Sequence, residues 1–365
     1  MPYTFDGKRF IRDRSYTKDL LNSPDKERNL WKKLSQFDAE NQLVADNIDV
    51  ADVDDYLSIE AFFSNRPEVP RVSGQPLVET LKQHGAVTYS HELGWCIPAW
   101  SALMYAHNIA DFVPLQNLAP RVLQFTSSTR TDLKREWTFS EGYVLSFPKV
   151  MELIETIRPG GESIVPSGRR VIIPALPGIA FREVYANALM HQNLEDTGKF
   201  ITVEVFADHI DVTNPGQPLV DPQRFIDAAS TTRNPALGEA LRQAHFVEQR
   251  GSGWDKIVFA LEEHHFPPAL IRTNGSTTVT LSAYRPFSMM SQTERVQAVY
   301  QHACLRLLEN QPVNNTSVRT RFGLNDSQAS QVIRLLKATT EAGLIKPYDP
   351  AAGPKTLRYI PFWAD

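Results

Sequence analysis

The sequence has few cysteines, no strong excess of one charge and no long hydrophobic run. The two cysteines, Cys96 and Cys304, lie far apart in 365 residues, which excludes a disulfide framework and a cysteine-based metal site. The net charge of −4 argues against a protein whose whole surface binds nucleic acid. No stretch approaches the roughly eighteen apolar residues of a membrane helix, and the N-terminus lacks a signal-peptide pattern. We therefore expect a cytoplasmic protein without a membrane partner.

The first 115 residues divide into a polar tail and a segment rich in helix signals. Residues 1–45 are polar, and YTFDGKRFIRDRSYTKDL predicts a hairpin around Asp6-Gly7 followed by a helix. Because an isolated hairpin is marginal in water, this tail either docks on later residues or ends a domain that lies upstream. Residues 46–115 hold helix signals and two short alternating segments, and we interpret them as a small helical connector.

Strands and helices interleave in the middle of the chain. Helices are expected at 143–157, 179–193, 234–249 and 253–265, with strands at 120–125, 168–174 and 199–216 and a hairpin at Asn274-Gly275. Helices on one face of a mixed sheet are the natural packing of such a pattern. The predicted fold class is therefore α+β, with an α/β sandwich over residues 116–288.

Residues 289–365 have a different pattern, with three helical segments, short connections and two strands around a Gly-Pro tip. This order predicts a winged helix-turn-helix. Residues 291–365 contain nine Lys/Arg and six Asp/Glu, so this part is +3 and the remainder −7.

A polar line runs through the otherwise apolar stretch FREVYANALMHQN at 181–193. Glu183, Asn187 and His191 are four residues apart, and four residues turn a helix by about 400°, so all three share one face. Alone, this edge could simply face solvent. Two later features favour a binding site: DVTNPGQP (211–218) ends a strand in a polar turn, and RGSGWDKI (250–257) places glycines before a helix whose start favours an anion.

Together with TTRNPAL, these motifs resemble the GHKL (gyrase, Hsp90, histidine-kinase, MutL) ATP-binding fold, also called the Bergerat or HATPase fold. The branch is the RecG-like C-terminal region of predicted transcriptional regulators, in which an AlbA-type Schlafen domain comes first and a winged helix last. The resemblance implies that residues 1–45 are the remnant of the AlbA-type domain. It also implies ATP and Mg²⁺ as cofactors.

The resemblance further implies roles for single residues. Asn187 matches the asparagine that coordinates Mg²⁺, and Glu183 matches the base that orients and deprotonates the attacking water. The phosphate-binding glycine motif corresponds to Gly251, Ser252 and Gly253.

Other candidate nucleotide contacts are less specific. Asn214, followed by Gly216, stands where the family carries an aspartate that accepts the adenine amino group, so it could equally serve another base. Arg233 is the one cation near the phosphates, although Arg233-Asn234 could also be a turn and helix cap. His191 is either a further nucleotide contact or a packing residue.

The third helix of the C-terminal module would enter the DNA major groove. Its first exposed positions carry Gln and Arg, which can read base edges, and nearby basic residues could bind phosphates. The candidate DNA contacts are Arg319, Arg321, Ser327, Gln328, Gln331, Arg334, Lys355 and Arg358.

The leading hypothesis is a transcriptional regulator that binds ATP with Mg²⁺ and whose nucleotide controls DNA binding by the winged helix. The first helix of that module, 294–310, could form the apolar face of a homodimer. The alternatives are an ATPase, slow because the lid at 217–250 is short, in a nucleic-acid or phage-defence system, and an interaction scaffold with a degenerate nucleotide site. No Gly-rich phosphate loop ending in Lys-Ser/Thr occurs, so a helicase motor is not indicated.

Overall fold

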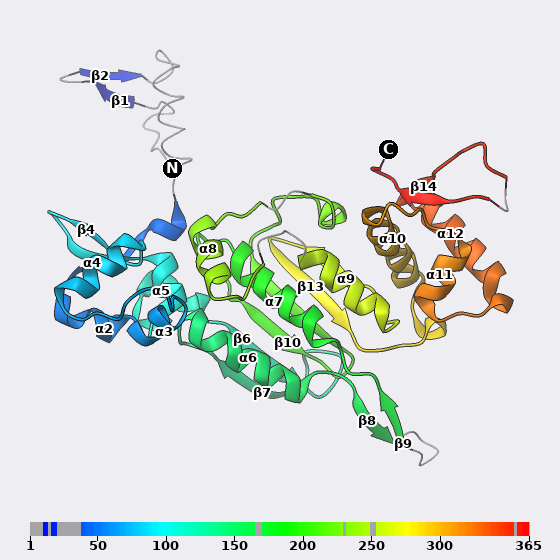
Figure 1. Cartoon of the computed structure of the whole chain (residues 1–365), viewed down its shortest axis with the longest axis horizontal. Helices are drawn as coiled ribbons and strands as arrows, with labels where there is room; N and C mark the ends of the chain where they lie inside the picture. The colour runs from blue at the N-terminus through cyan, green and yellow to red at the C-terminus, as the bar shows by residue number, and fades with distance from the viewer. Residues whose placement is uncertain are drawn as a thin grey trace.

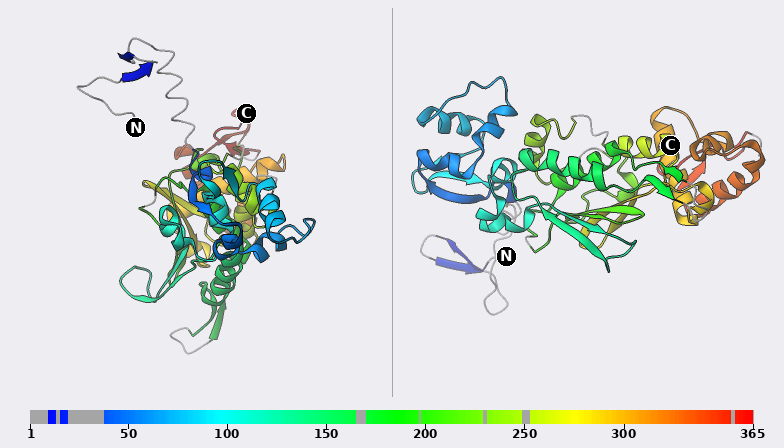
Figure 2. Two further views of the ribbon diagram at one scale, coloured as in Figure 1. Left: turned by 90° about the vertical axis from the view of Figure 1, so that its left-hand side faces the viewer. Right: turned by 90° about the horizontal axis from the view of Figure 1, so that it is seen from below.

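A computed structural model describes residues 10–13, 16–19, 38–164, 170–196, 198–228, 231–248, 253–353 and 356–364. An N-terminal module, a central α/β domain and a C-terminal module follow one another along the long axis (Figure 1, Figure 2). None of the described helices is both long enough and apolar enough to cross a membrane.

The N-terminal hairpin differs from the predicted one. Strands β1 (Phe10–Asp13) and β2 (Tyr16–Asp19) pair antiparallel, with Phe10 opposite Asp19. Strand β2 lies in the segment for which a helix was expected, and Asp6 and Gly7, the expected turn, lie outside the described residues. The β-propensity of Phe, Ile, Tyr and Thr accounts for the difference, because these side chains suit a pleated surface.

The two alternating segments of the N-terminal module belong to a three-stranded sheet, whose first strand the helical interpretation missed. Its strands β3 (Leu43–Ile48), β4 (Thr88–Ser90) and β5 (Gly94–Pro98) form an antiparallel sheet in the order β3-β5-β4. The sheet packs with α2 (Val53–Tyr56), α3 (Ile59–Ser64), α4 (Gln75–Gln83) and α5 (Ala99–Tyr105). Every side chain of α5 is buried, so its sequence does not show the alternation of apolar and polar faces that is typical of a surface helix.

The central domain contains a six-stranded mixed sheet in the order β12-β13-β11-β10-β6-β7. Three of its five pairings (β12-β13, β11-β10 and β6-β7) join strands that follow each other in sequence. The other two cross intervening helices: β11 pairs antiparallel with β13, and β6 pairs parallel with β10. The strands are β6 (Arg121–Phe125), β7 (Leu133–Thr138), β10 (Thr202–Val205), β11 (His209–Pro215), β12 (Leu270–Thr273) and β13 (Ser276–Ser282). The expected hairpin at Asn274-Gly275 is present, with Gly275 at φ +67°.

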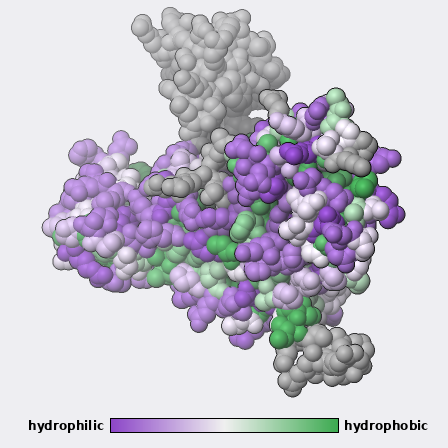
Figure 3. Space-filling view, turned by 45° about the vertical axis from the view of Figure 1, so that its right-hand side comes forward, coloured by the Kyte–Doolittle hydropathy of each residue, from purple (hydrophilic) through white to green (hydrophobic). Residues whose placement is uncertain are grey.

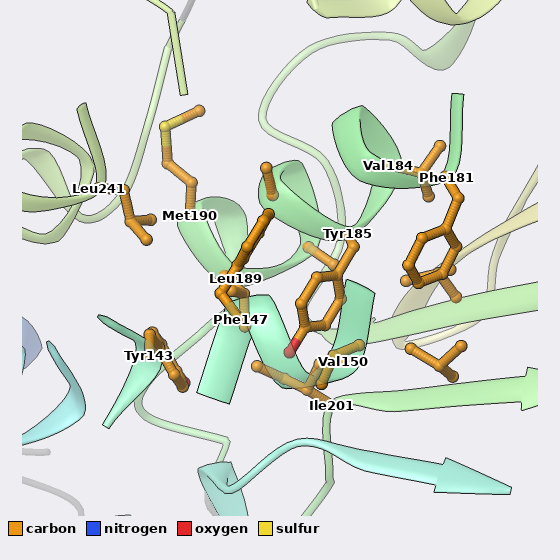
Figure 4. Packing of buried hydrophobic residues seen from close by; sticks show 14 of the residues in the cluster. Tyr143, Phe147, Val150, Phe181, Val184, Tyr185, Leu189, Met190, Ile201 and Leu241 are labelled. Atoms are coloured by element: carbon orange, nitrogen blue, oxygen red, sulfur yellow. The ribbon is translucent and has the colours of Figure 1, made fainter. Parts of the chain in front are cut away.

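Helices cover one face of this sheet, as predicted for an α+β domain (Figure 1). They are α6 (Tyr143–Ile157), α7 (Gly178–His191), α8 (Pro235–Gln243) and α9 (Gly253–Glu263). Phe147 and Val150 of α6 lie beside Tyr185 of α7 and near Ile201, whereas Met190 of α7 points toward α8 (Figure 4). Phe147 and Tyr185 lie with ring centroids 5.2 Å apart, which fixes α7 against α6.

A hairpin of β8 (Gly161–Ile164) and β9 (Arg170–Ile173) projects from the domain beyond the sheet (Figure 1). Ile172 on β9 is 84% exposed. Polar residues cover most of the face in Figure 3, with hydrophobic residues gathered beside one grey segment at its lower edge.

The C-terminal module has the predicted order of elements: α10 (Gln292–Leu308), α11 (Asn315–Phe322), α12 (Ala329–Glu341), β14 (Ile345–Pro347) and β15 (Tyr359–Pro361). Capping boxes at Ser291 and Asn314 begin α10 and α11. The apolar face of α10, including Val299 and Cys304, is buried within the chain, so it is not free to form the predicted dimer face. The homodimer therefore remains a prediction, and α10 does not supply the dimer face that was expected for it.

Short 3-10 helices connect these elements. They are η2 (Ala39–Asn41), η3 (Val50–Asp52), η4 (Ile109–Asp111), η5 (Val113–Leu118), η6 (Pro222–Arg224), η7 (Phe287–Met289) and η8 (Asp326–Gln328).

Candidate functional site

A cavity of about 360 Å³ lies between α7, the end of β11, the segment after β11 and the first turn of α9. All three residues of the predicted polar line on α7 contribute to its wall. The polar edge of this helix therefore faces a cavity instead of bulk solvent. The predicted nucleotide residues that line the cavity are Glu183, Asn187, His191, Asn214, Arg233 and Gly253.

Gly253 brings the start of α9 against the polar edge of α7. A Cβ added at Gly253 would lie 3.2 Å from Oε2 of Glu183 and 3.4 Å from Nδ2 of Asn187. A larger side chain would therefore fill the space between the two helices. Because the first backbone N–H groups of a helix lack intrahelical partners, this junction suits an anion. Gly251 and Ser252 lie outside the described residues.

Glu183 is a buried carboxylate with an adjacent cation. It is 3% exposed, and Nη1 of Arg182 donates to its Oε1 at 2.5 Å. Burial raises the pKa of the Glu183 carboxyl, and the positive charges of Arg182 and Lys256 oppose that rise. A carboxylate with a raised pKa at a cavity wall can accept a proton from bound water.

Asn187 fits the role of a magnesium ligand that acts together with a phosphate. Its side chain is partly exposed on the cavity wall and has no hydrogen-bond partner among the described residues. The described part of the chain holds no group of three or more His, Cys, Asp or Glu side chains suited to a metal. Since Mg²⁺ commonly takes one or two protein oxygens plus phosphates and waters, Asn187 could hold the ion only when a nucleotide supplies further ligands.

His191 and Arg233 meet at the other end of the polar line. Burial and the nearby Arg233 charge lower the pKa of His191 to about 4, so its imidazole is neutral near pH 7. Arg233 donates to the backbone carbonyls of His191 at 3.4 Å and Gln217 at 2.5 Å. Its guanidinium therefore ties the start of the 217–248 segment to the end of α7.

Asn214 lies in the buried end of β11, opposite Thr277 of β13. Its Nδ2 donates to the carbonyl of Pro215 at 3.1 Å, which leaves its Oδ1 as an acceptor for an amino group. Gly216 follows at φ +92°, and a Cβ there would lie 2.7 Å from Cβ of Asn193. Only glycine fits this turn, because both the backbone angle and the close neighbour exclude a side chain.

One interpretation of Arg233-Asn234 was a helix cap. Asn234 directly precedes α8, but its side chain does not cap that helix. Its Nδ2 donates to the carbonyls of Met190 at 3.0 Å and Gln192 at 2.8 Å, and its side chain makes no capping bond to α8. The buried amide therefore closes the end of α7 and anchors the segment that follows β11.

Several cavity residues had no sequence signal. Thr277 lines the wall and donates to the carbonyl of Gly216 at 2.8 Å. Phe225 and Trp254 also line it, with ring centroids 5.2 Å apart and planes at 81°. Trp254 follows the glycine motif directly and could have been noticed, whereas Phe225 and Thr277 reach the cavity only through the tertiary fold.

The predicted DNA contacts do not form one surface. Arg321 is buried: its Nη2 donates to the carbonyl of Phe266 at 2.8 Å, and its Nε lies 3.4 Å from Oε2 of Glu262. Burial lowers the pKa of Arg321 to about 10. This placement argues against a phosphate contact, because the guanidinium joins the C-terminal module to the central domain. Arg319 is partly buried and pairs with Asp326 and Asn315.

The remaining candidates lie nearer the surface. Ser327 and Gln328 bond to Asn325 in the cap of η8, which occupies part of their hydrogen-bonding capacity. Gln331 is half-buried, whereas Arg334 on α12 and Arg358 before β15 are exposed. Lys355 lies outside the described residues.

Comparison with known proteins supports the central part of the prediction. Residues 198–281 match the family HATPase_c_4, described as "Putative ATP-dependent DNA helicase recG C-terminal". The match spans less than half of the chain, includes Asn214, Arg233 and Gly253, and begins after α7. This region is therefore similar to a RecG-like ATP-binding domain.

The whole chain also resembles a solved structure. The crystal structure of the DIP2311 protein from Corynebacterium diphtheriae matches 97% of this chain and 70% of its own, with a TM-score of 0.52 and 18% identity. At this identity the likeness concerns the fold alone. No curated protein matches the sequence.

Proposed function

We propose that the central domain binds Mg-ATP in the cavity beside α7 and that nucleotide controls DNA binding by the C-terminal module, as in a transcriptional regulator. The observation that carries the nucleotide part is the meeting of Glu183, Asn187 and Gly253 at one point. That point adjoins a region similar to an ATP-binding domain. An acid, a free amide and a glycine at a helix start are the groups that a metal-bound triphosphate needs.

Calorimetry with Mg-ATP tests this part. The wild type should bind, and Asn187→Ala should bind about tenfold more weakly, because one metal ligand corresponds to roughly 1.4 kcal/mol or more. Gln311→Ala is the matched control, since it removes an exposed carboxamide outside the cavity. Equal affinities of wild type and Asn187→Ala would exclude the magnesium role.

The same geometry supports slow ATP hydrolysis. Glu183 lies on the cavity wall one helical turn from Asn187, the proposed metal ligand. Glu183→Gln keeps the shape but removes the base, so phosphate release should fall by about 10²-fold or more while binding persists. Unchanged release would exclude Glu183 as the base.

Two contacts support control of the C-terminal module by the cavity. Helix α9 begins in the cavity wall and, near its other end, Oε1 of Glu262 lies 2.6 Å from Nδ1 of His302 on α10. In addition, Tyr300 on α10 donates to the carbonyl of Gln223, which belongs to the segment that follows β11. A movement of α9 or of that segment would therefore reach α10 directly (Figure 1).

Fluorescence anisotropy with duplex DNA tests the DNA part. Affinity should change when Mg-ATP is added, and it should fall as salt increases, because phosphate contacts release counterions. DNA affinity that is independent of both salt and nucleotide would exclude the regulator and leave a nucleotide-binding scaffold.

A further inference from the structure

The N-terminal module holds α8 at both of its ends. Glu40 on η2 accepts hydrogen bonds from the backbone N–H groups of Ala236 and Leu237 at 2.9 and 2.8 Å. At the other end, Nη2 of Arg66 donates to Oε1 of Gln243 at 2.6 Å. Glu40 is 1% exposed and Arg66 is 3% exposed.

The Glu40 contact replaces a local helix cap. The first N–H groups of a helix need acceptors, and a carboxylate there also interacts favourably with the helix dipole. Asn234, which precedes α8, uses its amide to bind the end of α7 instead. Glu40, 196 positions earlier in the chain than Ala236, therefore supplies the acceptors for α8.

Arg66 is in turn held by the core of the N-terminal module. Its Nη1 donates to the hydroxyl of Tyr105 at 2.6 Å, and its guanidinium carbon lies 4.3 Å from the centroid of the Phe62 ring. The contact with Gln243 therefore connects α8 to the rigid interior of the module, because both partners of Arg66 are fully buried.

Helix α8 is part of the nucleotide cavity. Pro235, Gly238 and Arg242 on α8 line the cavity wall beside α7. A Cβ at Gly238 would lie 3.4 Å from the sulfur of Met190, so α8 packs closely on α7. A displacement of α8 would consequently change the width of the cavity.

We infer that Glu40 and Arg66 are positioning residues of the nucleotide site, so that the N-terminal module is a structural part of that site. The inference rests on the proposed binding of Mg-ATP. Release of either end would let α8 move away from α7 and lower nucleotide affinity. By reciprocity, bound nucleotide would tighten the contact between the N-terminal module and α8.

Glu40→Gln and Arg66→Met in the full chain test the inference. Each should bind Mg-ATP about tenfold more weakly, because a charge-assisted hydrogen bond is lost and its buried partner is left unpaired. The matched controls are Glu60→Gln and Arg71→Met, which break an exposed ion pair of the same module. These controls should keep wild-type affinity.

Hydrogen exchange separates positioning from general stability. In Glu40→Gln without nucleotide, amides of 236–243 should exchange faster than in wild type, while amides of α6 stay protected. Wild-type exchange at 236–243 together with wild-type affinity would overturn the inference. If Glu40→Gln does not fold, Arg66→Met gives the same two readouts.

The two proposals fail differently. Absence of Mg-ATP binding by the wild type would remove the proposed function and, with it, the role in the nucleotide site. Wild-type binding that is equally strong in Glu40→Gln and Arg66→Met would overturn only the role of the N-terminal module.

Discussion

The central cavity and the C-terminal module differ in how well single residues could be assigned. Six predicted nucleotide residues line one cavity, whereas the predicted DNA contacts divide among a buried interface, a helix cap and an exposed surface. The residues of α7 were chosen from helical spacing, which fixes the direction of a side chain, and the other cavity residues from the resemblance to the GHKL fold. The DNA candidates were chosen partly from their position at the start of the third helix and partly for charge alone, which does not fix the direction of a side chain. Four measurements test this difference.

The largest effect is expected at Arg321. Arg321→Ala should lower the free energy of unfolding by about 3 kcal/mol, because it removes a buried guanidinium together with its ion pair to Glu262 and its hydrogen bond to the carbonyl of Phe266. Arg319→Ala, two residues away, should cost about 1 kcal/mol or less, since its partner Asp326 is exposed. Urea unfolding of both variants checks the ranking. If both variants lost the same free energy of unfolding, Arg321 would not be the buried structural contact described above and could again be a DNA contact.

A pH effect is expected at His191. The pKa of His191 is lowered to about 4 in the folded chain, so between about pH 6.5 and 4 the unfolded chain binds a proton that the folded chain does not. Stability should therefore fall by about 3 kcal/mol as pH decreases through this window. Urea unfolding at several pH values should show this fall in the wild type.

The fall should be smaller in His191→Gln, whereas His264→Gln, which removes an exposed imidazole, should keep it. Identical pH profiles of wild type and His191→Gln would show that His191 is not the titrating group.

Nucleotide affinity should be sensitive to added volume at Gly253. Gly253→Ala places a methyl group 3.2 Å from Glu183 Oε2 and should weaken Mg-ATP binding about tenfold. Gly178→Ala is the matched control at the first residue of α7, where the added Cβ would meet only the ends of the Arg158 and Glu155 side chains. Calorimetry distinguishes the two variants. Wild-type affinity of Gly253→Ala for Mg-ATP would exclude a phosphate contact at Gly253.

The smallest effect on stability is expected at Arg334. Its side chain is exposed on α12, so Arg334→Ala should change the free energy of unfolding by less than about 0.5 kcal/mol. It should still weaken DNA binding severalfold and flatten the salt dependence. Anisotropy titrations at several salt concentrations provide the measurement. Unchanged DNA binding in both Arg334→Ala and Arg358→Ala would leave the C-terminal module without a DNA contact from this set.

The limits of each element were predicted best where the local pattern was strong. Helix 143–157 agrees with α6 at both ends, and the Asn274-Gly275 hairpin lies as expected. The RecG-like ATP-binding region is supported by the family match. By contrast, β3 of the N-terminal module was missed, because it is short and pairs with β5, which lies far from it in sequence.

By itself the sequence determined the helices, the main hairpins and the side of α7 that carries polar groups, since helical period and turn chemistry act over a few residues. Only the tertiary structure decided which side chains face those groups. Gly253 meets Glu183, Glu40 caps α8, and Arg321 is buried against Glu262. These contacts join residues far apart in the chain, and no local period records them, because they depend on how whole helices pack.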